Sequence, residues 1–310
     1  QGIGWTNLMQ GLMMVVIAWA LGLTTAEQFF GGVGEMFQQI KDQAPEYLTM
    51  PGATGMGWGA FSTAVLVSAL GCVMWPHIFM KFYSAKDVRT LKRVFVLYPL
   101  YSYLLVPLLI IGFAGIVLLA DTPLDSPDRV LLTIVVELAD LPAWVIGLAL
   151  SGALAAAMST AANLAHTSAT ILVRDVVQFS PRMRALPEHK ALSLTRYGVI
   201  AISLMAYLLA LANPGSLVSL LLGAYGIIVQ LLPMLLGALF WRRASQTAAF
   251  IGLSVGAVIT LLLQFGIDAP FGWHPGFCGL VVNSAIFVII SLMRKSRESR
   301  SPVESLSPQV

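Results

Sequence analysis

Charged side chains are scarce in this chain of 310 residues. Lys, Arg, Asp and Glu make up 11% of the residues, whereas hydrophobic residues make up 57%. Soluble proteins carry about 25% charged residues, and a water-facing surface needs them because charged side chains are seldom buried unpaired. This composition, with a mean hydropathy of +0.82, excludes a soluble enzyme.

Residues that would build metal, disulfide or acid–base chemistry are also few. The two cysteines, Cys72 and Cys278, lie in apolar segments, so no disulfide framework is predicted. The four histidines are scattered, and none has a second His or a carboxylate at helical spacing for a metal. The apolar segments contain no paired carboxylates. No basic face exists outside the loops, so no nucleic-acid partner is expected.

The chain has long apolar runs instead. Each of six charge-free runs reaches or exceeds the ~20 residues with which a helix crosses about 30 Å of hydrocarbon. Lipid allows only helices and closed barrels to span it, and no run alternates as a barrel strand does. Asn213, Pro214 and Gly215 divide the longest run into two helices. With a last span at 277–293, the sequence predicts an all-α, polytopic membrane protein with about eight transmembrane helices. The runs are residues 5–24, 58–80, 94–120, 141–173, 197–241 and 244–267.

The basic residues indicate the orientation of these spans. All but two of the 18 basic residues fall in alternate loops and the C-terminal tail, the exceptions being Lys41 and Arg129. By the positive-inside rule these loops are cytoplasmic. We therefore expect a multi-pass protein of the cell membrane, embedded in the lipid bilayer, with both ends of this chain cytoplasmic. Residues 1–295 are expected to form the transmembrane domain and residues 296–310 a disordered tail.

Two segments of the outer loops have helical periodicity. Residues 27–40 place Phe29, Val33, Phe37 and other apolar residues at helical spacing, and residues 126–138 repeat the pattern. We expect the first to be a short helix lying on the outer surface. A role for both as an external lid is the alternative.

Residues 151–170 are the most informative segment, and most of them are Ala, Gly, Ser or Thr. This composition is typical of close helix packing. In an α-helix, however, the carbonyl of residue 156 points toward Ser159 and Thr160, so three uncharged oxygens converge. Such oxygens suit a hard monovalent cation held within the membrane. One helix cannot complete the coordination shell of that cation, so other segments must supply further oxygens.

Pro76 is the second notable feature, because it interrupts the charge-free run 58–80. Proline removes a backbone hydrogen bond and kinks or breaks a helix. Trp75 and His77 flank it. A proline kink is often only structural, but transporter sites are typically built at interrupted helices, so both interpretations stay open.

These motifs resemble those of the sodium:solute symporter family, whose members have the LeuT-type fold of two inverted five-helix repeats. The similarity covers nearly the whole chain and implies that it holds core helices five to ten and two more. Because the first four core helices would be missing, we expect an incomplete transporter. The matching segments are 4–11 (GWTNLMQG), 75–77 (WPH) with 84–87 (SAKD), 152–175 and 225–243.

The resemblance implies sodium-coupled symport of a small organic solute by alternating access. Its sodium ligands would be the Ala156 carbonyl and the hydroxyls of Ser159 and Thr160, with Na+ as coupling ion and no other cofactor. Relatives often have Asp where this chain has Asn7. The choice between sodium and proton coupling therefore stays open.

The resemblance also implies a solute site. Trp75 and His77 would contact the solute at the interrupted sixth core helix, Tyr103 would line the cavity from the seventh, and Gln230 from the tenth. A small organic acid is the expected solute class. Two alternatives remain, namely a symporter-like membrane sensor domain and an intramembrane hydrolase built around a Ser–His pair. A sensor would need a long cytoplasmic module, and only a short tail follows Met293.

Overall fold

The computed structural model describes residues 2–52, 55–122, 124–180, 187–212 and 215–293, and no strand occurs among them. Within this described part, seven helical segments are long and apolar enough to cross a membrane, and the number is eight when the two helices that meet at Pro76 are counted as one broken span. The predicted all-α membrane protein with about eight spans is confirmed. Residues 213 and 214 of the predicted turn, and the predicted tail 296–310, lie outside the described residues.

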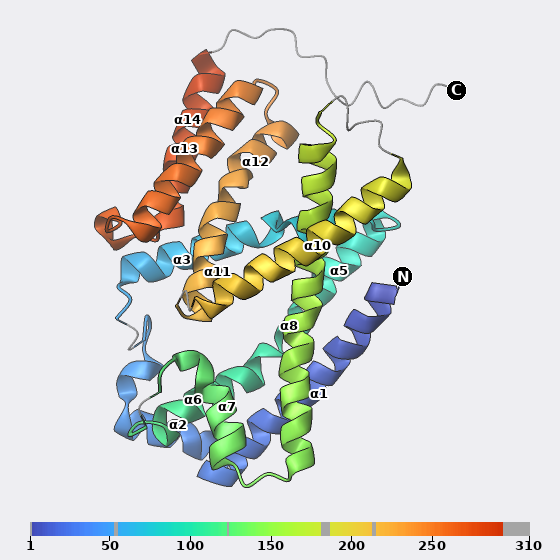
Figure 1. Ribbon diagram of the computed structural model, residues 1–310. Helices are drawn as coiled ribbons and strands as arrows, with labels where there is room; N and C mark the ends of the chain where they lie inside the picture. Colours follow the sequence, from blue (N-terminus) through green and yellow to red (C-terminus); the bar gives the residue numbers. More distant parts are fainter. Residues whose placement is uncertain (1, 53–54, 123, 181–186, 213–214, 294–310) are drawn as a thin grey trace. The chain divides into compact units, whose positions relative to one another are not determined.

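The chain forms two compact units, Gln1–Ala53 with Pro76–Leu217, and Thr54–Trp75 with Val218–Val310. Figure 1 labels the main helices of each. Unit 1 contains α1 (Gly2–Phe30), α2 (Val33–Gln43), η1 (Pro45–Leu48), α4 (Pro76–Tyr83), α5 (Val88–Ser102), α6 (Leu105–Leu118), η3 (Pro127–Arg129), α7 (Val130–Thr133), η4 (Ile134–Leu138), α8 (Ala143–Ile171), η5 (Leu172–Val177) and α10 (Glu188–Leu211). Unit 2 contains α3 (Trp58–Gly71), η2 (Cys72–Met74), α11 (Leu217–Ile228) from its second residue, η6 (Val229–Leu231), α12 (Leu232–Phe240), α13 (Gln246–Phe265), η7 (Pro270–Gly272) and α14 (Pro275–Met293).

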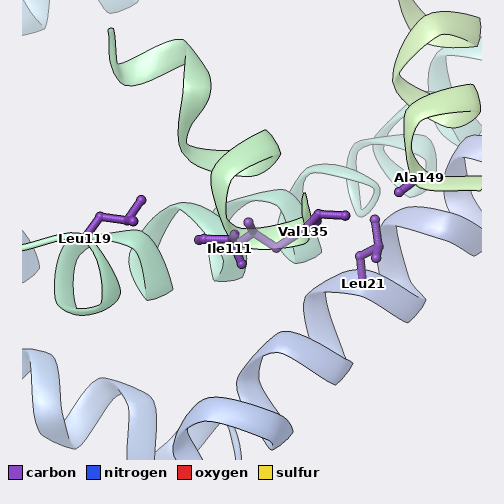
Figure 2. Packing of buried hydrophobic residues seen from close by; sticks show 6 residues of the cluster. Leu21, Ile111, Leu119, Val135 and Ala149 are labelled. Atoms are coloured by element: carbon purple, nitrogen blue, oxygen red, sulfur yellow. The ribbon is translucent and has the colours of Figure 1, made fainter. Parts of the chain in front are cut away.

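The core of unit 1 lies where α1 packs against α6 and α8. Leu21 of α1, Ile111 of α6, Val135 of η4 and Ala149 of α8 belong to one buried cluster (Figure 2). Gly152 of α8 allows the close approach of α1, because a Cβ atom there would lie 3.1 Å from the side chain of Ile17. Small residues at such crossings are what lipid-embedded helices use to pack closely.

The outer segment after α1 differs from the sequence prediction. Helix α1 continues to Phe30, so the first amphipathic helix is α2 and starts at Val33, not at residue 27. The break falls at Gly31 and Gly32, whose φ angles of 77° and 139° favour glycine. The apolar face of α2 packs against α6 through Phe37 and Phe113, whose ring centroids are 5.2 Å apart. This face is therefore part of the unit 1 core.

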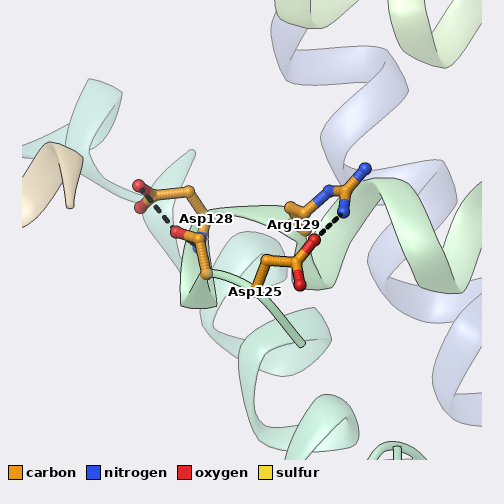
Figure 3. Close-up of polar contacts among 4 residues, drawn as sticks. Asp125, Asp128 and Arg129 are labelled. Carbon is orange, nitrogen blue, oxygen red and sulfur yellow. Dashed lines mark hydrogen bonds and ion pairs between the residues drawn. The ribbon is translucent and has the colours of Figure 1, made fainter. Parts of the chain in front are cut away.

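The second outer segment, residues 126–138, begins with a polar cap. The Ser126 hydroxyl oxygen accepts a hydrogen bond from the backbone N–H of Asp128 at 3.2 Å, which starts η3. Arg129 forms an ion pair with Asp125 at 2.7 Å, one turn away (Figure 3). Of the apolar residues that follow, Ile134 and Val135 are buried against α1, α6 and α8. Both outer segments are thus packed elements of unit 1.

The loop between α4 and α5 ends in a helix cap. The backbone N–H of Thr90 donates to the Asp87 carboxylate at 2.6 Å, three residues on, as an N-cap does. Hydrogen bonds from the Thr90 hydroxyl and then from its backbone N–H lower the pKa of Asp87. The carboxylate therefore stays ionised at neutral pH and fixes the start of α5.

Unit 2 is built on the hairpin of α13 and α14, which pack closely along their length. Gly252 and Gly256 of α13 form a small-residue face with a spacing of four residues. A Cβ atom on Gly256 would lie 2.7 Å from the Cβ of Asn283 and 2.5 Å from Oε1 of Gln230. Glycine at this position lets polar side chains from two other helices meet at the hairpin.

We predict that Ile40→Ala destabilises the full-length protein, because Ile40 is 0% exposed at the α2–α6 contact. Removing such a side chain from a packed core costs about 2–5 kcal/mol. The measurement is thermal unfolding in detergent. The neighbouring exposed residue provides the control, Lys41→Ala, which should leave the midpoint unchanged. Equal midpoints for both variants would mean that α2 is not packed on α6.

Candidate functional site

The oxygen patch predicted on α8 lies within an unbroken helix. The Ser159 hydroxyl donates to the Ala156 carbonyl oxygen at 2.9 Å, so these two oxygens are adjacent. Asn163 Nδ2 donates to the Ser159 carbonyl at 2.8 Å, one turn later. The Thr160 side chain is exposed. Because a hydroxyl that donates one hydrogen bond keeps two lone pairs, Ser159 and Thr160 both present oxygen electron pairs without a formal charge.

Helix α1 crosses α8 near this patch. The two helices run in opposite directions (Figure 1) and touch where Ile17 meets Gly152. Gln10 on α1 and Ser159 on α8 each lie seven residues from this contact, toward the same end of the helix pair. The Gln10 side-chain oxygen is buried and has no hydrogen-bond partner among the described residues. It is a buried acceptor on the helix that crosses α8.

The sequence analysis did not assign Gln10 a role, although it lies in the segment that resembles the fifth core helix. The available signal was a polar side chain in a charge-free span, three residues after Asn7 and so on the same helix face. Asn7 is half-buried in α1. The two amides give this face of α1 oxygens but no charge.

The break at Pro76 is present. Trp75 has a φ of −58° and a ψ of 125°, an extended conformation that proline imposes on the residue before it. Helix α3 with η2 ends there, and α4 starts at Pro76. In unit 2 the Trp75 ring packs edge to face on Tyr225, with centroids 5.6 Å apart. The interrupted span that the sequence predicts is confirmed.

The remaining candidates in unit 1 are His77 and Tyr103. His77 is half-buried in the first turn of α4, and α4 packs against α8. The helix that carries His77 is thus a neighbour of the helix that carries the oxygen patch. Tyr103 is 61% exposed at the junction between α5 and α6, where its backbone N–H donates to the Leu100 carbonyl at 3.2 Å. It marks a second interruption.

Gln230 lies in a buried polar network within unit 2. Its Nε2 shares two protons among the carbonyls of Gly276 at 2.9 Å and Gly226 at 3.0 Å and the Thr260 hydroxyl at 3.3 Å. Asn283 Nδ2 donates to the Gln230 backbone carbonyl at 2.7 Å and to Oε1 at 3.2 Å. Every polar atom of the Gln230 amide is therefore engaged by α11, α13 and α14. This geometry fits a residue that holds the short η6 turn between α11 and α12 in place better than it fits a residue that binds solute.

The family is settled by the sequence comparison. The model of the sodium:solute symporter family matches residues 2–256. The chain belongs to this family. Its sequence is 28% identical to the "uncharacterized symporter YhjB" of Bacillus subtilis (strain 168), over 96% of this chain and 62% of that protein. It is 29% identical to the sodium/pantothenate symporter of Escherichia coli (strain K12), over 91% of this chain and 58% of that protein.

A solved structure confirms the fold. The chain matches the substrate-bound, outward-open state of a Na+-coupled sialic acid symporter with a TM-score of 0.75, at 19% identity, over 94% of this chain and 62% of that one. The predicted membership in a LeuT-type bundle is therefore confirmed. The chain spans about three fifths of the length of the curated relatives it matches.

We predict that Gln230→Leu lowers the thermal unfolding midpoint of the full-length protein. It leaves the Gly276 carbonyl without its buried donor, which costs about 1–3 kcal/mol, and the Asn283 amide keeps only the backbone carbonyl of residue 230 as a partner. The double variant Gln230→Leu/Asn283→Leu should lower the midpoint further, because that backbone carbonyl then loses its donor as well. Gln264→Leu, a half-buried glutamine on α13, is the control. If it costs as much as Gln230→Leu, the network is not the cause.

Proposed function

We propose that the full-length protein is a secondary transporter that couples uptake of a small organic solute to the sodium gradient. The observation that carries this proposal is the adjacent pair of oxygens of Ala156 and Ser159, 2.9 Å apart on α8. The pair lies in a chain whose family is named for this activity. Helix α4, which starts at the break expected to contact solute, packs on the same helix. Ion and solute elements are thus neighbours within unit 1.

Sodium would bind to the Ala156 carbonyl and to the hydroxyls of Ser159 and Thr160. The cation would exchange its water ligands for these oxygens, and other segments would supply the remaining ligands. An ion that binds one conformation better than the other shifts the population toward it by its differential affinity. Sodium would therefore hold the state that is open to the outside, and its loss to the cytoplasm would release the solute there. Alternating access follows from this linkage.

A small organic acid is the proposed solute class. Pantothenate and sialic acid, the solutes in the names of two similar proteins, both carry a carboxylate. No Lys or Arg occurs in α8, α11 or α12 to pair with such a group. The hydrogen-bond donors proposed at the Pro76 break are the Trp75 indole and the His77 imidazole. Tyr103, at the interruption between α5 and α6, is proposed as a further donor. Gln230 is proposed to hold η6 in place instead of touching the solute.

The alternatives differ from this proposal in what they require. An intramembrane hydrolase needs a serine that gives its proton to a histidine, whereas the Ser159 hydroxyl donates to Ala156. The members of the family are symporters, not enzymes. A sensor domain needs no net solute movement, so a measurement of uptake separates it from a transporter.

We predict that Ser159→Ala/Thr160→Ala raises the sodium concentration needed for half-maximal uptake by at least about tenfold, because two ligands are lost. The measurement is uptake of radiolabelled pantothenate, and of other small acids, by vesicles containing the full-length protein. The control is Ser168→Ala/Thr170→Ala, which removes the same residue types two to three turns further along α8. Its sodium dependence should match that of the unchanged protein.

Unchanged sodium dependence in the Ser159/Thr160 double variant would contradict the proposed ion site. Uptake that follows the proton gradient and ignores sodium would reassign the coupling ion. If the full-length protein moves no small acid with either ion, the transporter proposal itself fails for this solute class.

The topology gives a separate prediction. With both ends of the chain cytoplasmic, the loop after α4 faces the cytoplasm and the segment after α2 faces outside. We replace Cys72 and Cys278 by Ala and introduce Ser84→Cys or Thr49→Cys, both at exposed positions. A membrane-impermeant maleimide should label Thr49→Cys in intact cells and Ser84→Cys only after permeabilisation. The reverse pattern would show the opposite orientation.

A further inference from the structure

A cavity of about 680 Å³ lies within unit 2, between α12, α13 and α14. This volume falls within the roughly 300–1,000 Å³ that is usual for ligand pockets. Its wall is largely apolar and contains no charged side chain. Six of the residues that form it are Met234, Ala238, Ala249, Phe250, Leu253 and Phe287. A polar solute would find few hydrogen-bond partners along this wall, whereas a hydrocarbon chain would pack well against it.

One end of the cavity is polar. Ala244, Ser245, Gln246 and Thr247 form this end, where the chain enters α13. Arg242 and Arg243 come directly before them and are both exposed. Two exposed cations are thus adjacent in the sequence to the polar end of an apolar cavity.

Among the described residues of unit 2, no carboxylate lies close to this arginine pair in the sequence. Residues 218–267 and 275–293 contain no Asp or Glu, and Asp268 follows the opposite end of α13. The Arg–carboxylate pair seen among the described residues, Arg129 with Asp125, belongs to unit 1. Arginine binds phosphate groups through its planar guanidinium, so this end is complementary to an anionic phosphate.

Trp241, a residue type typical of the edge of the membrane, lies at this end of the cavity. It closes α12 just before Arg242, and its ring packs edge to face on Phe287 with centroids 5.7 Å apart. Tryptophan is enriched where hydrocarbon meets headgroups. A smaller groove of about 240 Å³ lies against the same pair of rings, between α12 and α14. The apolar cavity therefore suits the acyl chain of a lipid, and the cations next to its polar end suit the headgroup.

We propose that this cavity binds an anionic phospholipid, with one acyl chain against α12, α13 and Phe287 and the phosphate at Arg242 and Arg243. The occupant is a lipid because most of the wall is apolar, and it is anionic because the described part of unit 2 has no carboxylate at this end of α13. With the proposed topology, the lipid comes from the cytoplasmic leaflet, which carries the anionic headgroups. The site is separate from the oxygen patch on α8.

The test uses the full-length protein in nanodiscs that contain phosphatidylcholine and phosphatidylglycerol. One lipid at a time carries a photoactivatable diazirine in its acyl chain, and the cross-linked peptides are identified by mass spectrometry. We expect phosphatidylglycerol to label residues 234–253 at least about tenfold more than phosphatidylcholine, because each basic residue near the headgroups favours anionic lipid. This experiment on the unchanged protein does not depend on the folding of any variant or on transport.

Two variants separate the headgroup from the chain. Arg242→Gln/Arg243→Gln should reduce labelling by phosphatidylglycerol to the level of phosphatidylcholine. Ala238→Phe, which fills the cavity, should abolish labelling of residues 234–253 by either lipid. The matched control is Lys190→Gln/Arg196→Gln, which removes two cations from α10 and should change nothing.

Three outcomes would overturn the proposal. Equal labelling by the two lipids would show that the cavity does not select an anionic headgroup. An equal loss of labelling in the α10 control would show that the preference comes from the overall charge of the protein and not from Arg242 and Arg243. Absence of labelling at residues 234–253 in the unchanged protein would mean that another part of the full-length chain fills the cavity. Uptake measurements are unaffected by these results, so failure here leaves the transporter proposal standing.

Discussion

The structure depends on one constraint: within a membrane no water is present to satisfy a polar group, so the protein must satisfy each group itself. The hydroxyls on the spanning helices show how this is done. Ser151 bonds to the Gly147 carbonyl and Thr170 to the His166 carbonyl, each one turn back in its own helix. Ser159 follows the same rule with Ala156. Its hydroxyl is therefore satisfied without a cation.

The same constraint explains why breaks and polar networks occur together. At η6 the helix tightens into a 3₁₀ turn, and the Gln230 and Asn283 amides supply the hydrogen bonds around it. Glycines at 256 and 279 make room, since a Cβ atom at either position would collide with the polar side chains. A saturated network of this kind specifies one conformation, because a half-satisfied one would be costly. The break in unit 2 is thus held rigidly by its surroundings.

The spans were predictable from the sequence because their absence of charge is a local property, and the interruption at Pro76 because proline acts on its own helix. The bounds of α1 were not: residues 24–30 carry Thr and Glu, and only the φ angles at Gly31 and Gly32 show where the helix ends. Gln230 could be placed in the tenth core helix but its partners could not be foreseen. Apart from Gly226, one turn back, they lie 30 to 53 residues away in sequence and meet only when α13 and α14 pack.

The lack of charge at the oxygen patch bears on how ion and solute would be coupled. Asn7 and Gln10 give α1 amides where a carboxylate would neutralise a bound cation, and α8 contributes only carbonyl and hydroxyl oxygens. A cation bound to neutral oxygens in a medium of low dielectric keeps most of its field. An anionic solute bound on the neighbouring α4 would lower the energy of that cation, and by reciprocity the cation would strengthen binding of the solute to the same extent. At the proposed sites, neutral ligands on the protein would thus leave the solute's own carboxylate as the counter-charge, so that sodium and solute would each bind weakly alone and strongly together.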